Sequence, residues 1–490
     1  MKSFKEIAWF DKRIHISWLI AWVSIGILIG VGLSSQTGNY FVSSSWLLIA
    51  ISIILFSFAR RSRYVVLIVI LGGILVGLWR GAGMYVEMSN YTNFVGNKVE
   101  ISGIVSEDTT VGKKGDLQIR IGHVMIEGIK LPGSVWVSTT WGHDVRRGDE
   151  LVVRGLLGTG FGNTAASMFH AEIVDATRPY PGDMGRRLRD WFGSGVKRSM
   201  PPEDASLAMG FLVGQKITVD ETLMDQLRTV GLIHAVVASG YHLTVLVGVV
   251  RRIFLRVSKY LSTLMSAFMI GGFIMITGFS PSMSRAGLVS GLSLWAWYYG
   301  RVVHPIVLLS FAAAITVLIQ PSYIWGDVGW YLSFASFAGI VIAVPLIKSY
   351  FWGDKQGSWV REVLLATFAA QLLTLPLTVY FFGYFSGYAL LANLLVVPLV
   401  PLVMLLTFVA GTVGLLLPGI AALFGAPVRL LLWYMKAVVN WIANLPGSKI
   451  EVAVSAWWLV IGYILIFLGL VYLWRKTQYD FRQDDPDKLL

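Results

Sequence analysis

The chain has 490 residues, of which 55% are hydrophobic and 14% are charged. A soluble domain usually carries about 25% charged residues, so this composition excludes an ordinary soluble protein and indicates a polytopic membrane protein. No cysteine is present, which excludes disulfides, thiol nucleophiles and cysteine metal sites. The net charge of +12 is weak evidence for a nucleic-acid partner, because cytoplasmic loops of membrane proteins collect Lys and Arg.

Three apolar runs open the chain, and basic clusters flank them. Lys12 and Arg13 precede the first run, and Arg60 to Arg63 separate the second from the third. Lys and Arg concentrate on the cytoplasmic side, so residues 1–90 are predicted to be transmembrane helices with a cytoplasmic N-terminus. No clear cleavage site follows the first run, which we interpret as a retained helix. The predicted spans are Ile16–Leu33, Trp46–Phe58 and Tyr64–Trp79.

The region from residue 91 to residue 182 differs in character. Short stretches of alternating apolar and polar residues are separated by Gly, Asp and Asn, a pattern typical of β-strands. Five such strands favour a small β-barrel or sandwich, and an OB-like barrel is the expectation. Because the third span leaves the membrane on the far side, this all-β domain is predicted to be extracytoplasmic. The predicted strands are Lys98–Val105, Leu117–Ile126, Ser134–Thr140, Leu151–Leu157 and Met168–Val174.

Residues 183–230 form a predicted linker. Its first part, Asp183–Met200, combines five basic residues with Trp191 and Phe192, and a basic amphipathic stretch of this kind usually lies on a membrane surface. Anionic lipid and the phosphates of nucleic acid both remain open as its partners. Two short helices are predicted next, at Glu203–Val213 and Val219–Val230.

Residues 231–474 are predicted to form nine further spans, which brings the total to about twelve. Clusters of Arg and Lys follow the first, third, fifth and last of these spans, so alternation of the helices places every cluster in the cytoplasm. The charged tail, residues 475–490, is predicted to lie in the cytoplasm as well. Pro398 and Pro401 are expected to break one span or to form a re-entrant segment. The predicted spans are Gly231–Val250, Leu261–Phe279, Met283–Tyr299, Val303–Ile319, Val328–Ile347, Val363–Phe381, Tyr388–Leu406, Gly419–Leu445 and Trp457–Tyr472.

Three polar residues on the first of these nine spans are candidates for function, because polar groups at membrane depth must face protein or a water-filled path. They are His234, Ser239 and His242. The two histidines are too far apart on one helix to ligate the same metal, whereas Ser239 and His242 can touch. Three interpretations stay open: bonds between packed helices, a hydrated path, and a serine hydrolase built on Ser239 and His242.

Arg285 and Asp327 each open a span on the outer side. They can pair with each other, or lie separately in the headgroup region. Ser333, Gln371 and Asn393 follow on later spans, where a shared polar route and ordinary bonds between helices are both consistent with the pattern. The candidate path residues are therefore His234, Ser239, His242, Arg285, Asp327, Ser333, Gln371 and Asn393.

Candidate DNA-binding residues come from the β-domain and the linker. Trp136, Trp141, Phe161 and Phe169 offer rings on which bases can stack, but the acidic and basic residues of the β-domain nearly cancel. The candidates are Lys113, Lys114, Trp136, Arg146, Arg147, Arg186, Arg187 and Arg189. The chain has no P-loop and no dense group of metal ligands, so we expect no cofactor and no metal. Energy for active transport then comes from a partner or from the proton gradient.

Four stretches of the chain resemble, in order and spacing, signature elements of the ComEC family, the membrane channels of bacterial DNA uptake. The resemblance covers residues 46 to 417 and includes the arrangement of helices followed by an OB-like domain. The stretches are LAMGFLVG at 207–214 with GLIHAVVASGYHL at 231–243, GFSPSMSRA at 278–286, DVGWYLSFA at 327–335, and AQLLTLP at 370–376 with LANLLVVP at 391–398.

The resemblance implies a non-enzymatic channel that passes single-stranded DNA inward through the cytoplasmic membrane during natural transformation. Many relatives carry a C-terminal metallo-β-lactamase-like domain. Only a short tail follows the last span here, so we expect a short form that depends on a separate nuclease. Other implied partners are the lipid bilayer, an extracytoplasmic DNA receptor, a cytoplasmic ATPase motor and cytoplasmic proteins that bind single-stranded DNA. The alternatives are the intramembrane serine hydrolase and a transporter of another solute or envelope polymer.

Overall fold

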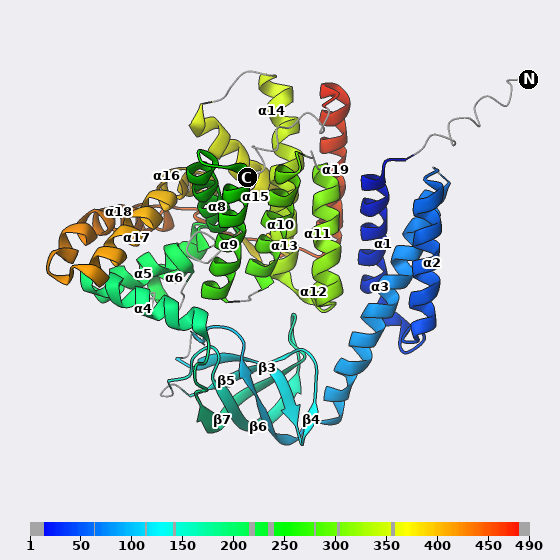
Figure 1. The fold of residues 1–490 in the computed structure, drawn as a ribbon, viewed down its shortest axis with the longest axis horizontal. Coiled ribbons are helices and arrows are strands. Elements are labelled where there is room, and N and C mark those ends of the chain that lie inside the picture. Colours follow the sequence, from blue (N-terminus) through cyan, green and yellow to red (C-terminus); the bar gives the residue numbers. More distant parts are fainter. Residues whose placement is uncertain are drawn as a thin grey trace, which may run out of the picture.

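The computed structural model describes residues 14–62, 64–112, 115–140, 144–214, 221–233, 240–278, 281–300, 304–353 and 358–479. A β-domain lies at one end of the molecule, and most of the long helices run away from it (Figure 1). Eight helices within the described residues are long and apolar enough to cross a bilayer. These features fit a membrane protein that carries a small β-domain.

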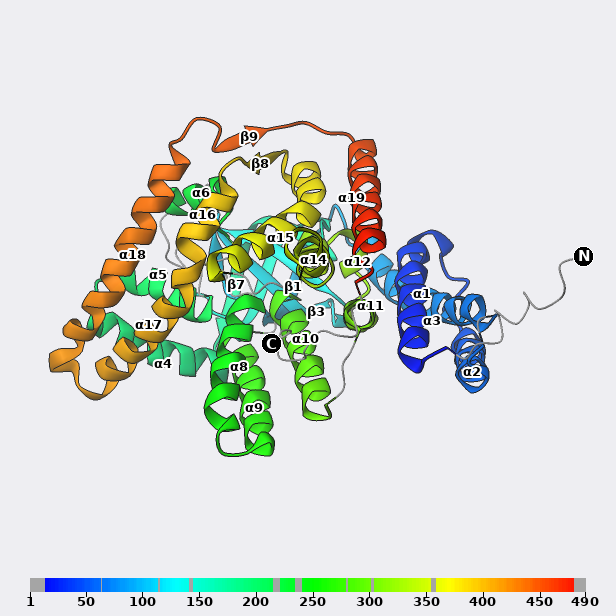
Figure 2. The same cartoon turned by 90° about the horizontal axis from the view of Figure 1, so that it is seen from above.

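Three N-terminal helices stand beside the main set of helices (Figures 1 and 2): α1 (Ile16–Thr37), α2 (Ser44–Arg60) and α3 (Val65–Ser89). Helices α1 and α3 approach closely through glycines. A side chain at Gly26 or Gly77 would collide with a backbone carbonyl of the opposite helix. Arg80 of α3 ties this group to the main set by donating to the carbonyl oxygens of Leu318 (2.9 Å) and Ile319 (3.1 Å).

The β-domain is a closed barrel, as expected. Its five long strands follow the order β1-β6-β7-β5-β3, and β1 also pairs with β3 and so closes the sheet. Strands β5 and β7 are parallel, whereas the other long-strand pairs are antiparallel. This is the arrangement of an OB-like barrel. The strands are β1 (Lys98–Val105), β2 (Thr110–Val111), β3 (Leu117–Ile126), β4 (Ile129–Lys130), β5 (Ser134–Thr139), β6 (Glu150–Thr159) and β7 (Ala166–Thr177).

The remaining chain is almost entirely helical, apart from a two-stranded sheet of β8 (Tyr384–Ser386) and β9 (Lys449–Glu451). The helices are α4 (Met184–Ser199), α5 (Pro202–Val213), α6 (Glu221–Thr229), α8 (Gly240–Leu255), α9 (Lys259–Thr277), α10 (Pro281–Tyr298), α11 (Pro305–Ile319), α12 (Tyr323–Gly326), α13 (Val328–Ala338), α14 (Val344–Trp352), α15 (Trp359–Phe382), α16 (Ala389–Val396), α17 (Val400–Leu416), α18 (Ala421–Ala443) and α19 (Ala456–Thr477).

Ten of the expected spans correspond to apolar helices. Eight reach full length, and α2 and α11 are apolar but shorter. The other two correspond to α8 and α10, whose described residues do not meet the same criterion of length and hydropathy. The total of about twelve spans therefore stays a prediction. Helices α8 and α10 pack against each other, so the most polar part of the membrane region is concentrated in one place.

The proline pair interrupts its helix as predicted. A 3₁₀ turn, Val397–Leu399, separates α16 from α17, and Pro401 stands in the first turn of α17. Helices α17 and α18 then run across the direction of α1, α11 and α19 (Figures 1 and 2). The two helices pack on the short helices α4, α5 and α6, and this group has a hydrophobic core of its own.

Helix α4 is the predicted amphipathic helix, but one of its faces is covered by other helices. Side chains at Gly185 and Gly195 would collide with backbone carbonyls of Met275 in α9 and Gly411 in α17. Its opposite face keeps Met184, Leu188 and Trp191 exposed. The helix thus packs on the helical domain and leaves its other face open.

Candidate functional site

The predicted path residues fall on helices that are neighbours in space. Helix α8 packs on α10, α10 on α13, α13 on α15, and α15 on α16. Seen along the helices, this series lies over the β-domain, whose strands are visible beneath it (Figure 2). Sequence order alone does not give this arrangement, because α9, α11, α12 and α14 intervene along the chain but not in the series.

The structure buries four of the predicted path residues and leaves two partly accessible. His234 and Ser239 lie outside the described residues, and so does any contact of Ser239 with His242. The exposed fractions are 0% for His242, 4% for Arg285, 9% for Asp327 and 3% for Asn393, while Ser333 and Gln371 are half-buried.

Helix α13 keeps much of its surface accessible although it lies inside the series. Of its residues only Trp330 is buried, and every residue from Tyr331 to Ala338 keeps partial accessibility. A π-helical turn at Gly339–Ala343 then joins α13 to α14, and Pro345 follows it. Such π-turns are frequent at functional sites. Most side chains of α13 are therefore not enclosed by the rest of the protein.

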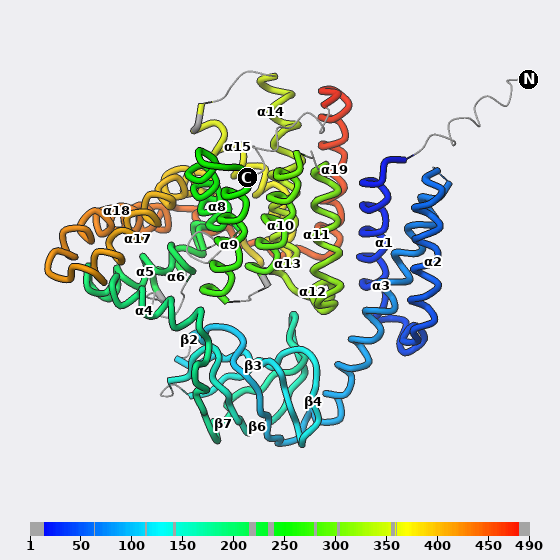
Figure 3. The backbone as a smooth tube through the Cα atoms, viewed as in Figure 1, coloured from blue at the N-terminus to red at the C-terminus, as the bar shows by residue number. Residues whose placement is uncertain are grey.

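Asp327 connects the helices to the barrel. One of its carboxylate oxygens accepts from the backbone N–H of Trp330 at 2.7 Å and caps α13. The other accepts from the side-chain amide of Asn163 at 2.7 Å. Asn163 belongs to the β6–β7 loop, residues 160–165, which rises from the barrel to α12 (Figure 3). Asp327 is therefore held from both sides.

Arg120 of β3 continues this contact into the barrel. Its guanidinium group donates to the side-chain oxygen of Asn163, to Glu107 at 2.8 Å and to the hydroxyl of Ser134 at 3.0 Å. Three side chains, Arg120, Asn163 and Asp327, thus form a continuous polar bridge from the barrel to α13. Sequence reasoning missed Asn163, because nothing local marks a loop residue that meets a helix 164 positions away.

Arg285 of α10 contacts the same end of α13 that the polar bridge reaches. We call the polar bridge together with Arg285 and the first turn of α13 the junction. Nη2 of Arg285 donates to the backbone carbonyl of Gly329, in the first turn of α13, at 3.0 Å. Nε and Nη1 are buried, and neither has a hydrogen-bond partner among the described residues. Of the two alternatives that the sequence left open, the direct pair of Arg285 with Asp327 does not form in the described part of the chain, where Asp327 instead binds Asn163 and caps α13. A buried cation with open donors favours an anion.

Three aromatic rings adjoin the bridge on the outer face of the barrel. Phe161 lies 5.9 Å from Trp136 and stacks on Phe169 at 6.5 Å, measured between ring centroids. Phe161 and Phe169 are 50% and 55% exposed. Trp136 stands directly opposite Arg120 across the β3–β5 pair. We call Trp136, Phe161 and Phe169 the aromatic platform; Trp141 lies outside the described residues.

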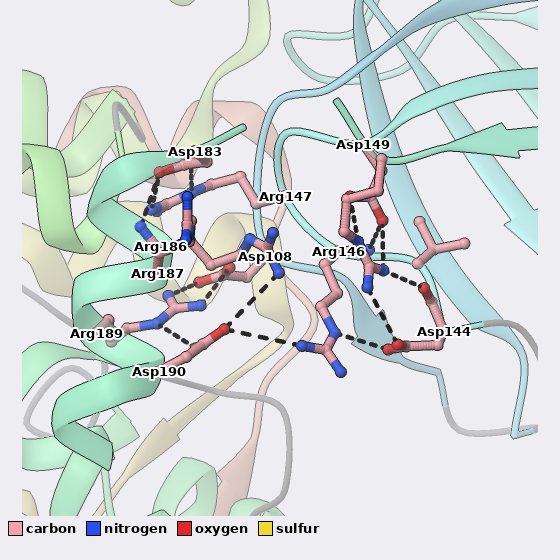
Figure 4. A network of polar contacts seen from close by, with 12 residues as sticks. Asp108, Asp144, Arg146, Arg147, Asp149, Asp183, Arg186, Arg187, Arg189 and Asp190 are labelled. Carbon is pink, nitrogen blue, oxygen red and sulfur yellow. Dashed lines mark hydrogen bonds and ion pairs between the residues drawn. The ribbon is translucent and has the colours of Figure 1, made fainter. Parts of the chain in front are cut away.

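Three of the arginines predicted to bind DNA are buried in a network between the barrel and α4 (Figure 4). Arg147 donates to Asp183 at 2.6 Å, Arg189 pairs with Asp108, and Arg186 pairs with Asp190 at 3.7 Å. Carboxylates thus already offset these charges, and the contacts hold the barrel against the helical domain. The exposed fractions of Arg147, Arg186 and Arg189 are 3%, 6% and 3%.

Two other predicted arginines remain accessible at the edge of this network. The side chain of Arg146 is 47% exposed beside Asp144, and Arg187 is exposed with its guanidinium group 5.2 Å from the ring of Tyr180. Lys113 and Lys114 lie outside the described residues. Within the described ranges no three His, Asp or Glu side chains gather as metal ligands.

Comparison with known proteins gives two findings. The family described as "Competence protein" matches residues 211–477. The protein named "ComE operon protein 3" of Bacillus subtilis (strain 168) is 25% identical over 269 residues, which are 54% of this chain and 33% of that relative. The chain therefore matches about a third of the length of that curated relative. No solved structure matches.

Proposed function

Because the chain belongs to the competence protein family, we propose that it is a channel that carries single-stranded DNA through the cytoplasmic membrane during natural transformation. Family membership and the relative from Bacillus subtilis support a role in competence DNA uptake. What we propose beyond this role is that the chain forms a channel, that its substrate is single-stranded DNA, and that transport runs inward. The observation that carries the proposal is Arg285: this buried cation of α10 lies against the first turn of α13, and two of its donors have no partner among the described residues.

A DNA strand supplies the groups that this junction favours. Each nucleotide brings one phosphate, and charge-assisted hydrogen bonds to Arg285 would hold it in place of the missing acceptors. The aromatic platform offers exposed rings nearby, and one of them, Phe161, lies two residues from Asn163 in the same loop. Unpaired bases stack on such rings, whereas the bases of a duplex are already stacked on each other. The combination favours a single strand.

We infer the orientation of the chain in the membrane from the positions of its basic residues. Arg252 and Arg256 at the α8–α9 turn, Lys348 in α14 and Arg475 in α19 belong to helix ends that lie away from the barrel (Figure 1). Lys and Arg concentrate on the cytoplasmic side. We therefore place both termini in the cytoplasm and the barrel outside. In this orientation the strand meets the barrel first and the helices afterwards.

Other proteins complete the proposed pathway. An extracytoplasmic receptor delivers the DNA, a nuclease removes one strand, and a cytoplasmic ATPase draws the other strand inward. Proteins that bind single-stranded DNA receive it. These partners are inferred from the proposed function.

Reconstitution in liposomes tests the proposal. Labelled single-stranded and double-stranded DNA of the same length are added outside, and the nuclease-protected fraction is measured. A channel for single strands protects only the single-stranded label, and Arg285→Ala reduces that fraction. Protection of neither label, with an inward-directed ATPase supplied, contradicts the proposal. Complete loss of activity in Ser239→Ala would favour the hydrolase, because a channel tolerates the removal of one hydroxyl.

A further inference from the structure

The segment that forms α8 to α12 contains no acidic residue. Between Asp225 and Asp327 the sequence has no Asp or Glu, although it has basic residues at both ends of the α8–α9 turn. An ordinary surface intersperses both signs of charge. Any acidic partner of the cations of this turn must therefore come from another part of the chain. The basic residues are Arg251, Arg252, Arg256 and Lys259.

Two of these cations converge on one ring. The guanidinium carbon of Arg251 lies 5.1 Å from the centroid of Trp297 in α10, and Nζ of Lys259 lies 5.2 Å from it. Lys259 is also 5.8 Å from the ring of Tyr298. Arg251 is only 8% exposed, and the Ser262 hydroxyl donates to its carbonyl oxygen at 3.1 Å. Contacts between α8, α9 and α10 thus hold positive charge in a fixed place.

The surroundings of this cluster combine exposed charge with exposed apolar surface. Arg252 and Arg256 are exposed, and neither forms an ion pair with an acidic residue of the described part of the chain. Val257 and Tyr260 beside them are 74% and 65% exposed. The turn lies at the end of α8 and α9 that points away from the barrel (Figure 1). Along α9 the apolar surface continues with Phe268, which is 77% exposed.

We propose that this cluster binds the headgroup of an anionic phospholipid. The phosphate would lie between Arg252 and Lys259, and the acyl chains would follow the exposed apolar side chains of α9. Basic sites between helices at the cytoplasmic side are suited to such headgroups. A nucleic-acid strand would use the cations but would leave the adjoining apolar surface in water. The site is independent of DNA transport.

Native mass spectrometry of the full chain, released from nanodiscs, tests this site. Nanodiscs of phosphatidylcholine with a minor fraction of phosphatidylglycerol allow bound lipids to be counted. The exposed pair is changed in Arg252→Gln/Lys259→Gln, which leaves the buried Arg251 in place. We expect this variant to retain phosphatidylglycerol about tenfold less than the wild type, because each surface cation contributes to anionic lipid binding. Lys259→Arg should retain it.

The matched control is Arg475→Gln/Lys476→Gln, which removes two cations from the last turn of α19. It should keep phosphatidylglycerol at the wild-type level. Equal loss in both double variants would show general attraction to a negative surface and would overturn the site. Equal retention of phosphatidylcholine, or displacement of the lipid by an oligothymidine strand, would overturn it as well. Thermal unfolding in phosphatidylcholine nanodiscs confirms that each variant is folded.

Discussion

Arg285 is a buried cation whose guanidinium group finds one acceptor, the carbonyl of Gly329, among the described residues. If phosphates complete its hydrogen bonds during transport, Arg285→Ala should reduce uptake of single-stranded DNA by about tenfold or more. Such a loss equals ~1.4 kcal/mol, near the lower end for a hydrogen bond to a charged group. Protein abundance in the membrane should not change.

Arg429→Ala is a suitable control for this prediction, because Arg429 is an arginine on α18 whose side chain is 54% exposed and lies away from the junction. It should leave uptake unchanged. Quantitative immunoblotting of membranes, run beside the uptake assay, separates the two roles of Arg285. Parallel loss of uptake and abundance would assign Arg285 to folding instead.

Asp183 links α4 to the barrel through Arg147, and this ion pair makes the stability of the fold depend on pH. Burial alone would raise the pKa of Asp183, but hydrogen bonds from Arg147 and from the backbone of Arg186 outweigh burial and hold the pKa below its usual value. A carboxylate with a lowered pKa stabilises the fold above its unfolded-state pKa of about 4, and this contribution disappears as the pH falls further. The melting temperature should therefore stay constant from about pH 7 to pH 5 and fall below about pH 4.

Asp183→Asn tests the source of that decline. The variant should melt at a lower temperature at neutral pH, because it leaves Arg147 buried without its carboxylate. Its melting temperature should also fall less between neutral and acid pH than that of the wild type. The comparison is Asp175→Asn, which changes an exposed carboxylate in β7 and should melt like the wild type. A decline as steep in Asp183→Asn as in the wild type would assign the acid sensitivity to other carboxylates.

The β6–β7 loop is the element that joins the aromatic platform to the helices. Phe161 stacks in the platform, Gly162 lies against Gly326, and Asn163 binds Arg120 and Asp327. Asn163→Ala removes both side-chain contacts and leaves buried polar groups without a partner, at a cost of about 1–3 kcal/mol. Hydrogen exchange should accelerate in the loop and in the first turn of α13, while the other barrel strands keep their protection.

Lys98→Ala, an exposed change at the start of β1, is the control for this variant. It should leave exchange in the loop and in α13 at the wild-type level. Faster exchange throughout the barrel in Asn163→Ala would mean that the residue stabilises the barrel rather than the bridge. Unchanged exchange in α13 would mean that the loop and the helix are not coupled.

An element can be predicted from the sequence when the residues that determine it are close together along the chain. The barrel strands are predictable because apolar residues alternate along each strand, and Pro398 and Pro401 predict the break before α17 by their lack of a donor. The burial of one face of α4 is not predictable in this way, because it depends on the close packing of its glycines against two distant helices, α9 and α17. The ion pairs of Arg147 and Arg189 could not be predicted for the same reason. Their carboxylate partners, Asp183 and Asp108, come from other elements.

At the scale of the whole molecule, orientation decides whether the barrel receives DNA or faces the cytoplasm. The chain has no cysteine, so single cysteines can report on each side without background. Lys130→Cys places a thiol on the exposed β4 strand, and Val257→Cys places one at the α8–α9 turn. A membrane-impermeant maleimide should label Lys130→Cys in intact spheroplasts, but Val257→Cys only after permeabilisation. The reverse pattern would place the barrel in the cytoplasm, where it cannot meet incoming DNA, and would contradict the proposed direction of transport.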